Sequence, residues 1–236
     1  IEARTLKLIE VCRLRDIPII TFINKMDRES RDVFDLLDEI EKTLALDTTP
    51  INWPVGRGRD FMGTYDIQTG GIRLLEGGGA KTGAMEKIEI SDLASRNANL
   101  DAGEIADELE LVKEASKPFD LQSFREGHMT PVYFGSALRN FGVGDLLEGL
   151  GRFAPSPRAQ DADKRKVEAD DPKMSAFVFK IQANMDPNHR DRIAFARLCS
   201  GKLTRGMKAK LVRTGKAMPL SSPQFFFAQD RAIADE

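Results

Sequence analysis

The sequence predicts an α/β domain built on a parallel sheet, followed by a domain made of β-strands. Residues 17–23 form a short, nearly continuous apolar run after a helical pattern, which is typical of a parallel strand covered on both faces. A second such run, residues 131–138, leads into a helical pattern at 145–153. Beyond residue 172, short alternating segments separated by glycines replace the helical periodicity.

The composition is that of an ordinary globular chain with room for two domains. Of 236 residues, 41% are hydrophobic and 31% are charged. No apolar run approaches the roughly 18 residues that span a bilayer, so no membrane partner is expected. Cys12 and Cys199 make no disulfide framework, which favours a cytoplasmic location. The chain starts at Ile1 inside a helical pattern, so we expect it to be truncated relative to a longer protein.

The elements of the α/β domain are expected in a regular order. A helix over residues 2–15 precedes the strand 17–23, and a polar loop, residues 24–28, follows that strand directly. Ser30 is the expected N-cap of the next helix, whose apolar residues recur at helical spacing.

Residues 48–118 lack the α/β pattern of the segments on either side of them and predict an α+β insertion into this domain. An acidic helix is expected over 101–117. Short strands punctuated by Gly and Pro are expected before it at 51–55, 61–67, 72–75 and 85–90.

The whole chain is therefore expected to contain a partial first domain at 1–157, a charged linker at 158–172 and a truncated β domain at 173–236. Residues 225–227 predict a buried strand of the β domain. Its other strands are expected at 176–182, 192–199 and 207–213.

The charge is divided unevenly between the two halves. Residues 1–151 carry a net charge of −9 and residues 152–236 a net charge of +7. Basic residues are concentrated between 176 and 216, which suggests a polyanionic partner. A basic, solvated face on a β domain explains the same charge equally well.

The strongest functional signal is the tetrapeptide Asn24-Lys25-Met26-Asp27, directly after the first predicted strand. This tetrapeptide resembles the guanine-recognition motif of P-loop GTPases, and its chemistry agrees with that resemblance. The Asp27 carboxylate can accept hydrogen bonds from both the ring N–H and the exocyclic amine of guanine, a donor pair that adenine lacks. Asn24 can bond the acceptors on the other edge of the base, and the Lys25 stem can lie along its plane. The alternative is a helix-capping loop, which is common in α/β proteins.

A second signal, Ser136-Ala137-Leu138, follows the second predicted strand. Together the two motifs resemble the guanine-recognition motifs of P-loop GTPases. The resemblance implies that the Ala137 N–H donates to the guanine O6 and that Ser136 braces the Asp27 carboxylate. Two such motifs in the right order, each ending an apolar strand, favour a guanine pocket over a capping loop.

The 109 residues between Asp27 and Ser136, followed by a linker and a β domain, resemble the translational GTPases that act on the ribosome. Within that group, five segments carry a more specific resemblance: 10–18, 21–25, 51–56, 107–113 and especially 179–195. These segments closely resemble the bacterial release factor 3 family.

The resemblance implies the C-terminal part of a P-loop GTPase domain, then an elongation-factor-type β-barrel. It implies a parent that hydrolyses GTP to GDP with Mg²⁺ and is a monomer. The parent would bind the terminating ribosome, both RNA and proteins, and promote departure of the stop-codon-reading release factor. The residues expected to contact ribosomal RNA are Lys180, Arg190, Arg192 and Lys202.

No segment matches the GxxxxGK[ST] phosphate loop, and no switch motif precedes the first strand. We therefore expect no catalytic residue and no metal ligand in this chain, and no GTP hydrolysis by it alone. Two alternatives remain open: a translocase like elongation factor G, and a non-catalytic ribosome-binding module.

Overall fold

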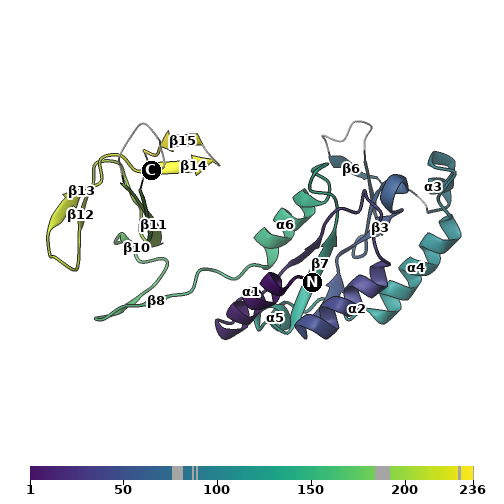
Figure 1. The fold of residues 1–236 in the computed structure, drawn as a ribbon, viewed down its shortest axis with the longest axis horizontal. Coiled ribbons are helices and arrows are strands. Elements are labelled where there is room, and N and C mark those ends of the chain that lie inside the picture. Colours follow the sequence, from purple (N-terminus) through teal and green to yellow (C-terminus); the bar gives the residue numbers. More distant parts are fainter. Residues whose placement is uncertain (76–81, 87, 89, 184–191, 228–229, 236) are drawn as a thin grey trace. The chain divides into compact units, whose positions relative to one another are not determined.

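The structure is a computed structural model that divides into two compact units, Ile1–Pro155 and Ser156–Glu236 (Figure 1). Within the part of the chain that it describes, no helix is long and apolar enough to cross a membrane. The described residues are 1–75, 82–86, 88, 90–183, 192–227 and 230–235.

A parallel sheet organises the first unit. Among the described residues its strands are β1 (Thr21–Ile23), β7 (Met129–Phe134) and β2 (Asp47–Pro50), in the order β1-β7-β2. Strand β7 lies in the middle and is buried along its whole length. Val132 and Phe134 face one hydrophobic cluster and Tyr133 faces another, as the alternation of a strand requires. The predicted α/β fold with a parallel sheet is thus confirmed.

Strand β2 was not expected, because its sequence Asp-Thr-Thr-Pro resembles a loop. Its two buried threonines are satisfied by side-chain hydrogen bonds. The Thr48 hydroxyl donates to a carboxylate oxygen of Glu41 at 2.7 Å, and the Thr49 hydroxyl donates to the Lys117 carbonyl at 3.1 Å. These partners let polar residues occupy a buried strand at the edge of the described sheet, which the hydrophobic pattern does not indicate.

An antiparallel sheet and two helices form most of the insertion. Its strands are β3 (Asn52–Val55), β4 (Gly63–Asp66), β5 (Ile72–Leu75) and β6 (Thr82–Glu86), paired in that order. The short 3₁₀ helix η1 (Gly58–Asp60) joins β3 to β4, and α3 (Ile90–Arg96) and α4 (Ala102–Ala115) follow β6. The strand expected at 85–90 is therefore wrong, because β6 ends at Glu86 and a helix begins at Ile90.

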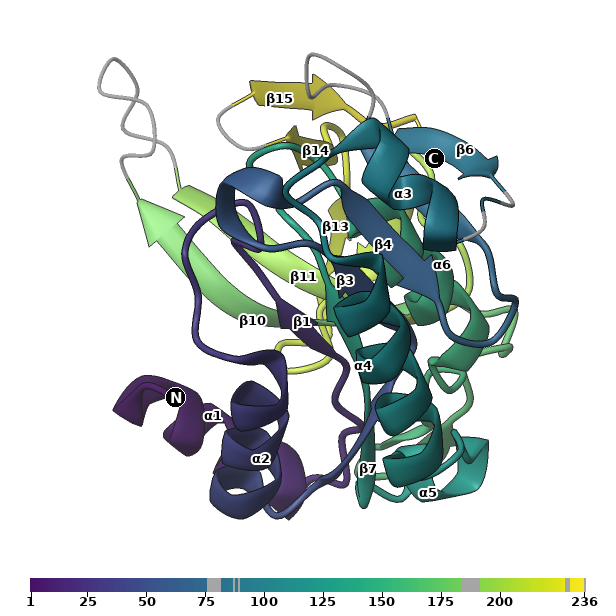
Figure 2. The same ribbon diagram turned by 90° about the vertical axis from the view of Figure 1, so that its right-hand side faces the viewer.

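Helices cover both faces of the parallel sheet. Helix α2 (Val33–Leu44) and α4 cover one face, and α5 (Leu121–Arg125) and α6 (Val143–Phe153) cover the other (Figure 2). Helix α1 (Ala3–Leu14) packs Ile9 against α2. The N-cap of α2 is Asp32 and not Ser30, because the Asp32 carboxylate accepts the Phe34 N–H at 2.9 Å.

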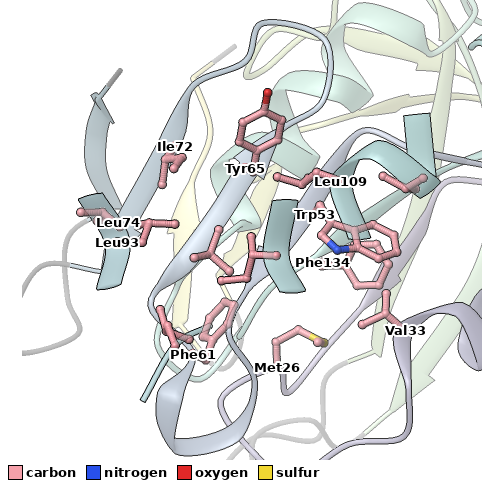
Figure 3. Packing of buried hydrophobic residues seen from close by; sticks show 14 of the residues in the cluster. Met26, Val33, Trp53, Phe61, Tyr65, Ile72, Leu74, Leu93, Leu109 and Phe134 are labelled. Carbon is pink, nitrogen blue, oxygen red and sulfur yellow. The ribbon is translucent and has the colours of Figure 1, made fainter. Parts of the chain in front are cut away.

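The main hydrophobic core joins α2, the insertion and β7. The fully buried Trp53 lies at its centre, with its ring centroid 4.9 Å from that of Phe34 and 5.5 Å from that of Phe134 (Figure 3). Aromatic pairs at these distances add to the free energy gained by burial. The insertion is therefore part of the core that supports the carboxyl ends of β1 and β7.

The second unit consists of paired antiparallel strands. They are β8 (Gln160–Asp161) with β9 (Lys166–Val167), β10 (Ser175–Ala183) with β11 (Arg192–Ser200), β12 (Lys208–Lys210) with β13 (Ala217–Pro219), and β14 (Gln224–Phe227) with β15 (Asp230–Ile233). The strand expected to end at residue 213 stops at Lys210, because the Gly215 N–H donates to the Leu211 carbonyl at 2.8 Å and closes a turn. The prediction of burial at 225–227 is wrong for Phe225, which is 54% exposed.

Candidate guanine-recognition site

Two loops meet where β1 and β7 end side by side. Ile23 pairs with Phe134 in the parallel ladder, and the Gly135 N–H donates to the Ile23 carbonyl at 3.0 Å. Further into the first loop, the Met26 N–H donates to the Gly135 carbonyl at 3.1 Å. Ladder-like bonding thus continues past the strands and fixes the two loops against each other, at the sheet edge where open α/β proteins bind ligands.

The first loop, Asn24–Asp27, is held by a buried side chain beneath it. Lys25 adopts the left-handed conformation with φ of 71°, and its carbonyl accepts the Arg28 N–H at 3.0 Å. The Met26 side chain is fully buried and points into the core toward Val33 and Phe134 (Figure 3). Met26, predicted as a binding residue, therefore anchors the loop, while Asn24 and Lys25 are exposed.

The second loop is a tight turn that presents four exposed residues, 137–140. Ser136 and Phe141 bond to each other in both directions, the N–H of each donating to the carbonyl of the other at 3.0 and 2.9 Å. Ala137, Leu138 and the following arginine are exposed on the turn between them. Gly135 is required here, since a Cβ atom would lie 2.4 Å from the Phe141 carbonyl oxygen.

Asn24 joins the two loops through its side chain. Its Oδ1 atom accepts the N–H of Ala137 at 2.8 Å and the N–H of Lys25 at 2.8 Å. The Ala137 N–H, expected to serve guanine O6, thus donates to the nearest acceptor, Asn24, in this structure. With its oxygen occupied in this way, Asn24 presents its amino group as the donor for a base acceptor.

The Asp27 carboxylate is nearly buried, with 8% of its side chain exposed, and it has a cationic neighbour. The Arg139 Nε atom lies 3.4 Å from its Oδ2 atom. Sequence reasoning missed Arg139, although a basic residue directly after the Ser-Ala-Leu triplet was a visible signal. The Asp27 carboxylate thus lies beside a guanidinium, and its oxygens can also accept hydrogen bonds from a ligand with N–H donors.

Ser136 lies at the junction of the loops but does not bond to Asp27. Its side chain is fully buried, and its hydroxyl has no hydrogen-bond partner among the described residues. The expected brace between Ser136 and Asp27 is therefore wrong for this structure, because the turn closes through the Ser136 backbone and Arg139 pairs with the carboxylate.

The basic residues proposed to meet RNA lie in the second unit. Lys180, Arg192 and Lys202 are exposed, and the Lys180 Nζ atom lies 5.1 Å from the centroid of the Phe195 ring. Arg190 lies outside the described residues. Across the described ranges, no group of three or more His, Cys, Asp or Glu side chains is arranged to hold a metal ion.

Residues 1–156 match the family model of the elongation factor Tu GTP binding domain, which covers well over half of the chain. The chain belongs to the translational GTPase family. Residues 173–236 match the model of elongation factor G domain 2.

A crystal structure of a protein from Thermus thermophilus has a similar fold, with a TM-score of 0.69 and 22% sequence identity. The match covers 100% of this chain and 35% of that one, so the chain spans about a third of the length of the solved protein. This translational GTPase chain thus carries a GTP-binding-domain segment in its first unit and elongation-factor-type β structure in its second.

Proposed function

We propose that this chain is the guanine-recognition part, together with the β domain, of a translational GTPase that acts on the terminating ribosome. The whole protein hydrolyses GTP and promotes release and recycling of the stop-codon-reading release factor. The residues proposed to form the nucleotide site are Asn24, Lys25, Asp27, Ala137 and Leu138, which face the nucleotide, and the buried Met26 and Ser136, which hold the two loops from beneath.

The observation that carries the proposal is the joining of the two motif loops at the ends of parallel strands. Asn24 bonds to Ala137 across the loops, and the Asp27 carboxylate lies in the same loop as Asn24. A carboxylate beside an amide matches the donor pair and the acceptors of guanine, whereas adenine presents no adjacent pair of donors. The site therefore supports selection of guanine by direct hydrogen bonding.

The chain supplies base recognition and not the hydrolytic step. Water attack on GTP requires a phosphate loop, switch residues and Mg²⁺. The 236 residues contain no GxxxxGK[ST] motif, so we assign Mg²⁺ binding and hydrolysis to other parts of the whole protein. Base contacts alone hold nucleotide weakly, and we expect a GDP dissociation constant for this chain no tighter than about 1 mM.

The substitution Asp27→Asn tests the guanine site. The amide places a donor where guanine also has donors, so GDP affinity should fall by about 1–3 kcal/mol. Xanthosine diphosphate, whose 2-oxo group accepts a hydrogen bond, should gain affinity. Calorimetric titration of the whole protein with both nucleotides measures this change of nucleotide preference. An unchanged GDP affinity would exclude Asp27 as the residue that recognises the base.

The termination role rests on residues 179–195, which resemble the release factor 3 family most specifically. A translocase like elongation factor G is the second candidate, favoured by the match of residues 173–236 to elongation factor G domain 2. A reconstituted ribosome assay separates the two. Faster departure of the stop-codon-reading factor supports the first, tRNA–mRNA movement supports the second, and ribosome binding without GTP turnover indicates a non-catalytic module.

A further inference from the structure

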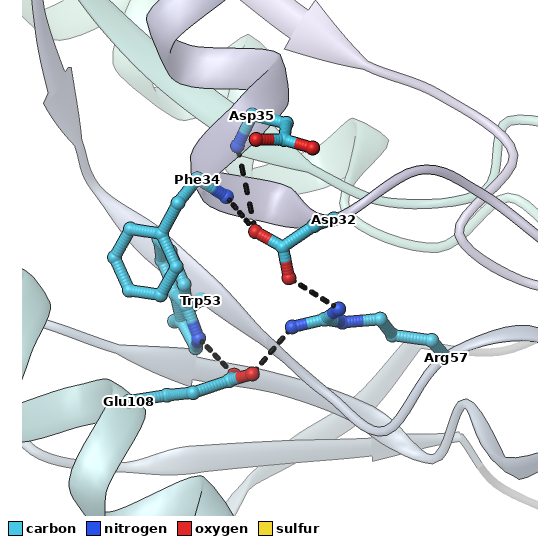
Figure 4. Close-up of polar contacts among 6 residues, drawn as sticks. All are labelled: Asp32, Phe34, Asp35, Trp53, Arg57 and Glu108. Atoms are coloured by element: carbon cyan, nitrogen blue, oxygen red, sulfur yellow. Dashed lines mark hydrogen bonds and ion pairs between the residues drawn. The ribbon is translucent and has the colours of Figure 1, made fainter.

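Arg57 bridges two acidic residues beside the guanine loop, the N-cap residue of α2 and a residue of α4 (Figure 4). Its Nη1 atom lies 2.9 Å from Oδ2 of Asp32, and its Nη2 atom bonds to Oε1 of Glu108 on α4. The other oxygen of Glu108 accepts the indole N–H of Trp53 at 3.0 Å. The Glu108 side chain is 19% exposed and that of Arg57 30%, so their bond is partly shielded from water, whereas the Asp32 side chain is 45% exposed.

Asp32 connects this cluster to the start of α2. Its Oδ1 atom caps the helix by accepting the N–H groups of Phe34 at 2.9 Å and Asp35 at 3.4 Å. Burial alone would raise the pKa of Asp32, but the bonds from Arg57 and from the two amides lower it below its usual value. The carboxylate is therefore ionised near neutral pH and can bond to helix and arginine together.

The residue next to Arg57 holds the guanine loop itself. The Gly58 N–H donates to the Met26 carbonyl at 3.0 Å, directly before Asp27 in the chain. One short segment thus contacts the backbone beside Asp27 and, through Arg57, the N-cap residue of the helix that follows the loop. Both ends of residues 26–32 are fixed to the insertion.

We propose that Arg57 is a positioning residue for guanine recognition: by joining Asp32 to Glu108 it holds the 26–32 segment so that Asp27 faces the base. This inference rests on the proposed function of the same site. A guanidinium is needed because its fork reaches two carboxylates at once, whereas a lysine ammonium is a single point donor. Small displacements of a recognition group lower affinity strongly, so the loss should be measurable.

The test compares GDP with inosine diphosphate, which lacks the 2-amino group. A displaced Asp27 loses its bond to that amino group, so Arg57→Met should lower GDP affinity by about tenfold and reduce the GDP preference over inosine diphosphate. General destabilisation would weaken both nucleotides alike and leave the ratio unchanged. Titrations use the whole protein, with the nearby exposed Arg59→Met as the matched control.

A gentler variant covers the case in which Arg57→Met does not fold. Asp32→Asn keeps an equally good helix cap and removes the carboxylate that Arg57 needs, so it should reduce the same ratio. Amide hydrogen exchange of the present chain supplies a nucleotide-free readout: either variant should speed exchange at Met26 and Arg28, and Arg59→Met should not.

The outcomes separate the two proposals. In one outcome the wild-type protein binds GDP, and both variants keep its GDP-to-inosine-diphosphate affinity ratio and its amide hydrogen exchange. That outcome overturns the positioning role of Arg57 and leaves the proposed function standing. Absence of GDP binding by the wild-type protein overturns the proposed function and, with it, the positioning role. A reduced ratio in Arg57→Met and Asp32→Asn, together with wild-type behaviour of Arg59→Met, supports the inference.

Discussion

Tyr133 shows how one residue reports on the packing of the sheet against a helix. Its ring lies under α6, and a Cβ atom on Gly149 would come within 1.9 Å of its hydroxyl oxygen. Burial raises the pKa of the Tyr133 phenol to about 12, because the charged phenolate is poorly solvated there. The folded chain therefore holds this proton more tightly than the unfolded chain does.

Replacing Tyr133 should change how the free energy of unfolding depends on pH in the alkaline range. A raised pKa in the folded state contributes stability that is complete below the unfolded value of about 10 and is lost as the pH rises toward 12. Tyr133→Phe removes that pH dependence. Urea unfolding between pH 8 and pH 11.5 measures it, with Tyr65→Phe as the control. Equal slopes for wild type and Tyr133→Phe would contradict the buried phenol.

At the scale of elements, the end of β7 is completed by a side chain. Asn52, at the start of β3, accepts the Phe134 N–H on Oδ1 at 2.7 Å and donates from Nδ2 to the Phe134 carbonyl at 3.2 Å. Strand β2 ends at Pro50, opposite Val132, so the carboxamide takes the place of a strand neighbour. The last residue before the Gly135–Ser136 turn is fixed in this way.

Asn52→Leu should destabilise the first unit. It leaves both backbone groups of Phe134 buried without partners, each costing about 1–3 kcal/mol. Thermal and urea unfolding of the first unit measure the loss, and the exposed Asn99→Leu is the control. A loss no larger than that of the control would mean that another group, or water, satisfies Phe134.

Sequence periodicity predicts strands and helices that are buried through apolar side chains. It does not predict strands whose buried polar side chains form hydrogen bonds with residues far away in the sequence. The apolar runs of β1 and β7 and the facing stripe of α4 were predictable, because burial imposes a regular spacing on each. Strand β2 was not, since its threonines depend on Glu41 and Lys117. The predicted strand 17–23 is paired only over its last three residues.

The residues of the candidate site likewise divide into those that the sequence predicted and those that it did not. The loops around Asn24 and Ser136 were predictable from short motifs after strands. Arg57 was not, because its two acidic partners lie 25 and 51 residues away along the chain. Asp32 and Glu108 are ordinary surface residue types, and only the packing of the insertion brings them to one guanidinium.

At the scale of the whole molecule, charge separates the two halves of the sequence. Residues 1–151 carry a net charge of −9, and residues 152–236 a net charge of +7. In the second unit the described basic residues between Lys180 and Lys216 are exposed. A positive surface on antiparallel strands suits the sugar–phosphate backbone of RNA, which such surfaces bind without reading sequence.

Charge reversal tests whether this basic surface binds RNA. Each lysine or arginine that contacts a phosphate releases counterions, so affinity should fall as salt rises. Lys180→Glu, Arg192→Glu and Lys202→Glu together should remove about three such contacts and lower the slope of log affinity against log salt by about 2. Filter binding or fluorescence titration of a ribosomal RNA fragment over a salt series measures both effects.

The control reverses the same number of charges on the first unit, at the exposed residues Arg4, Lys7 and Arg125. If the second unit meets RNA, this control lowers the net charge equally and leaves the salt slope unchanged, because residues that do not contact phosphate release no counterions. Equal losses in the two triple variants would mean that net charge governs binding. A salt-independent affinity would mean that the basic residues form only a solvent-exposed face of the second unit and do not contact phosphate.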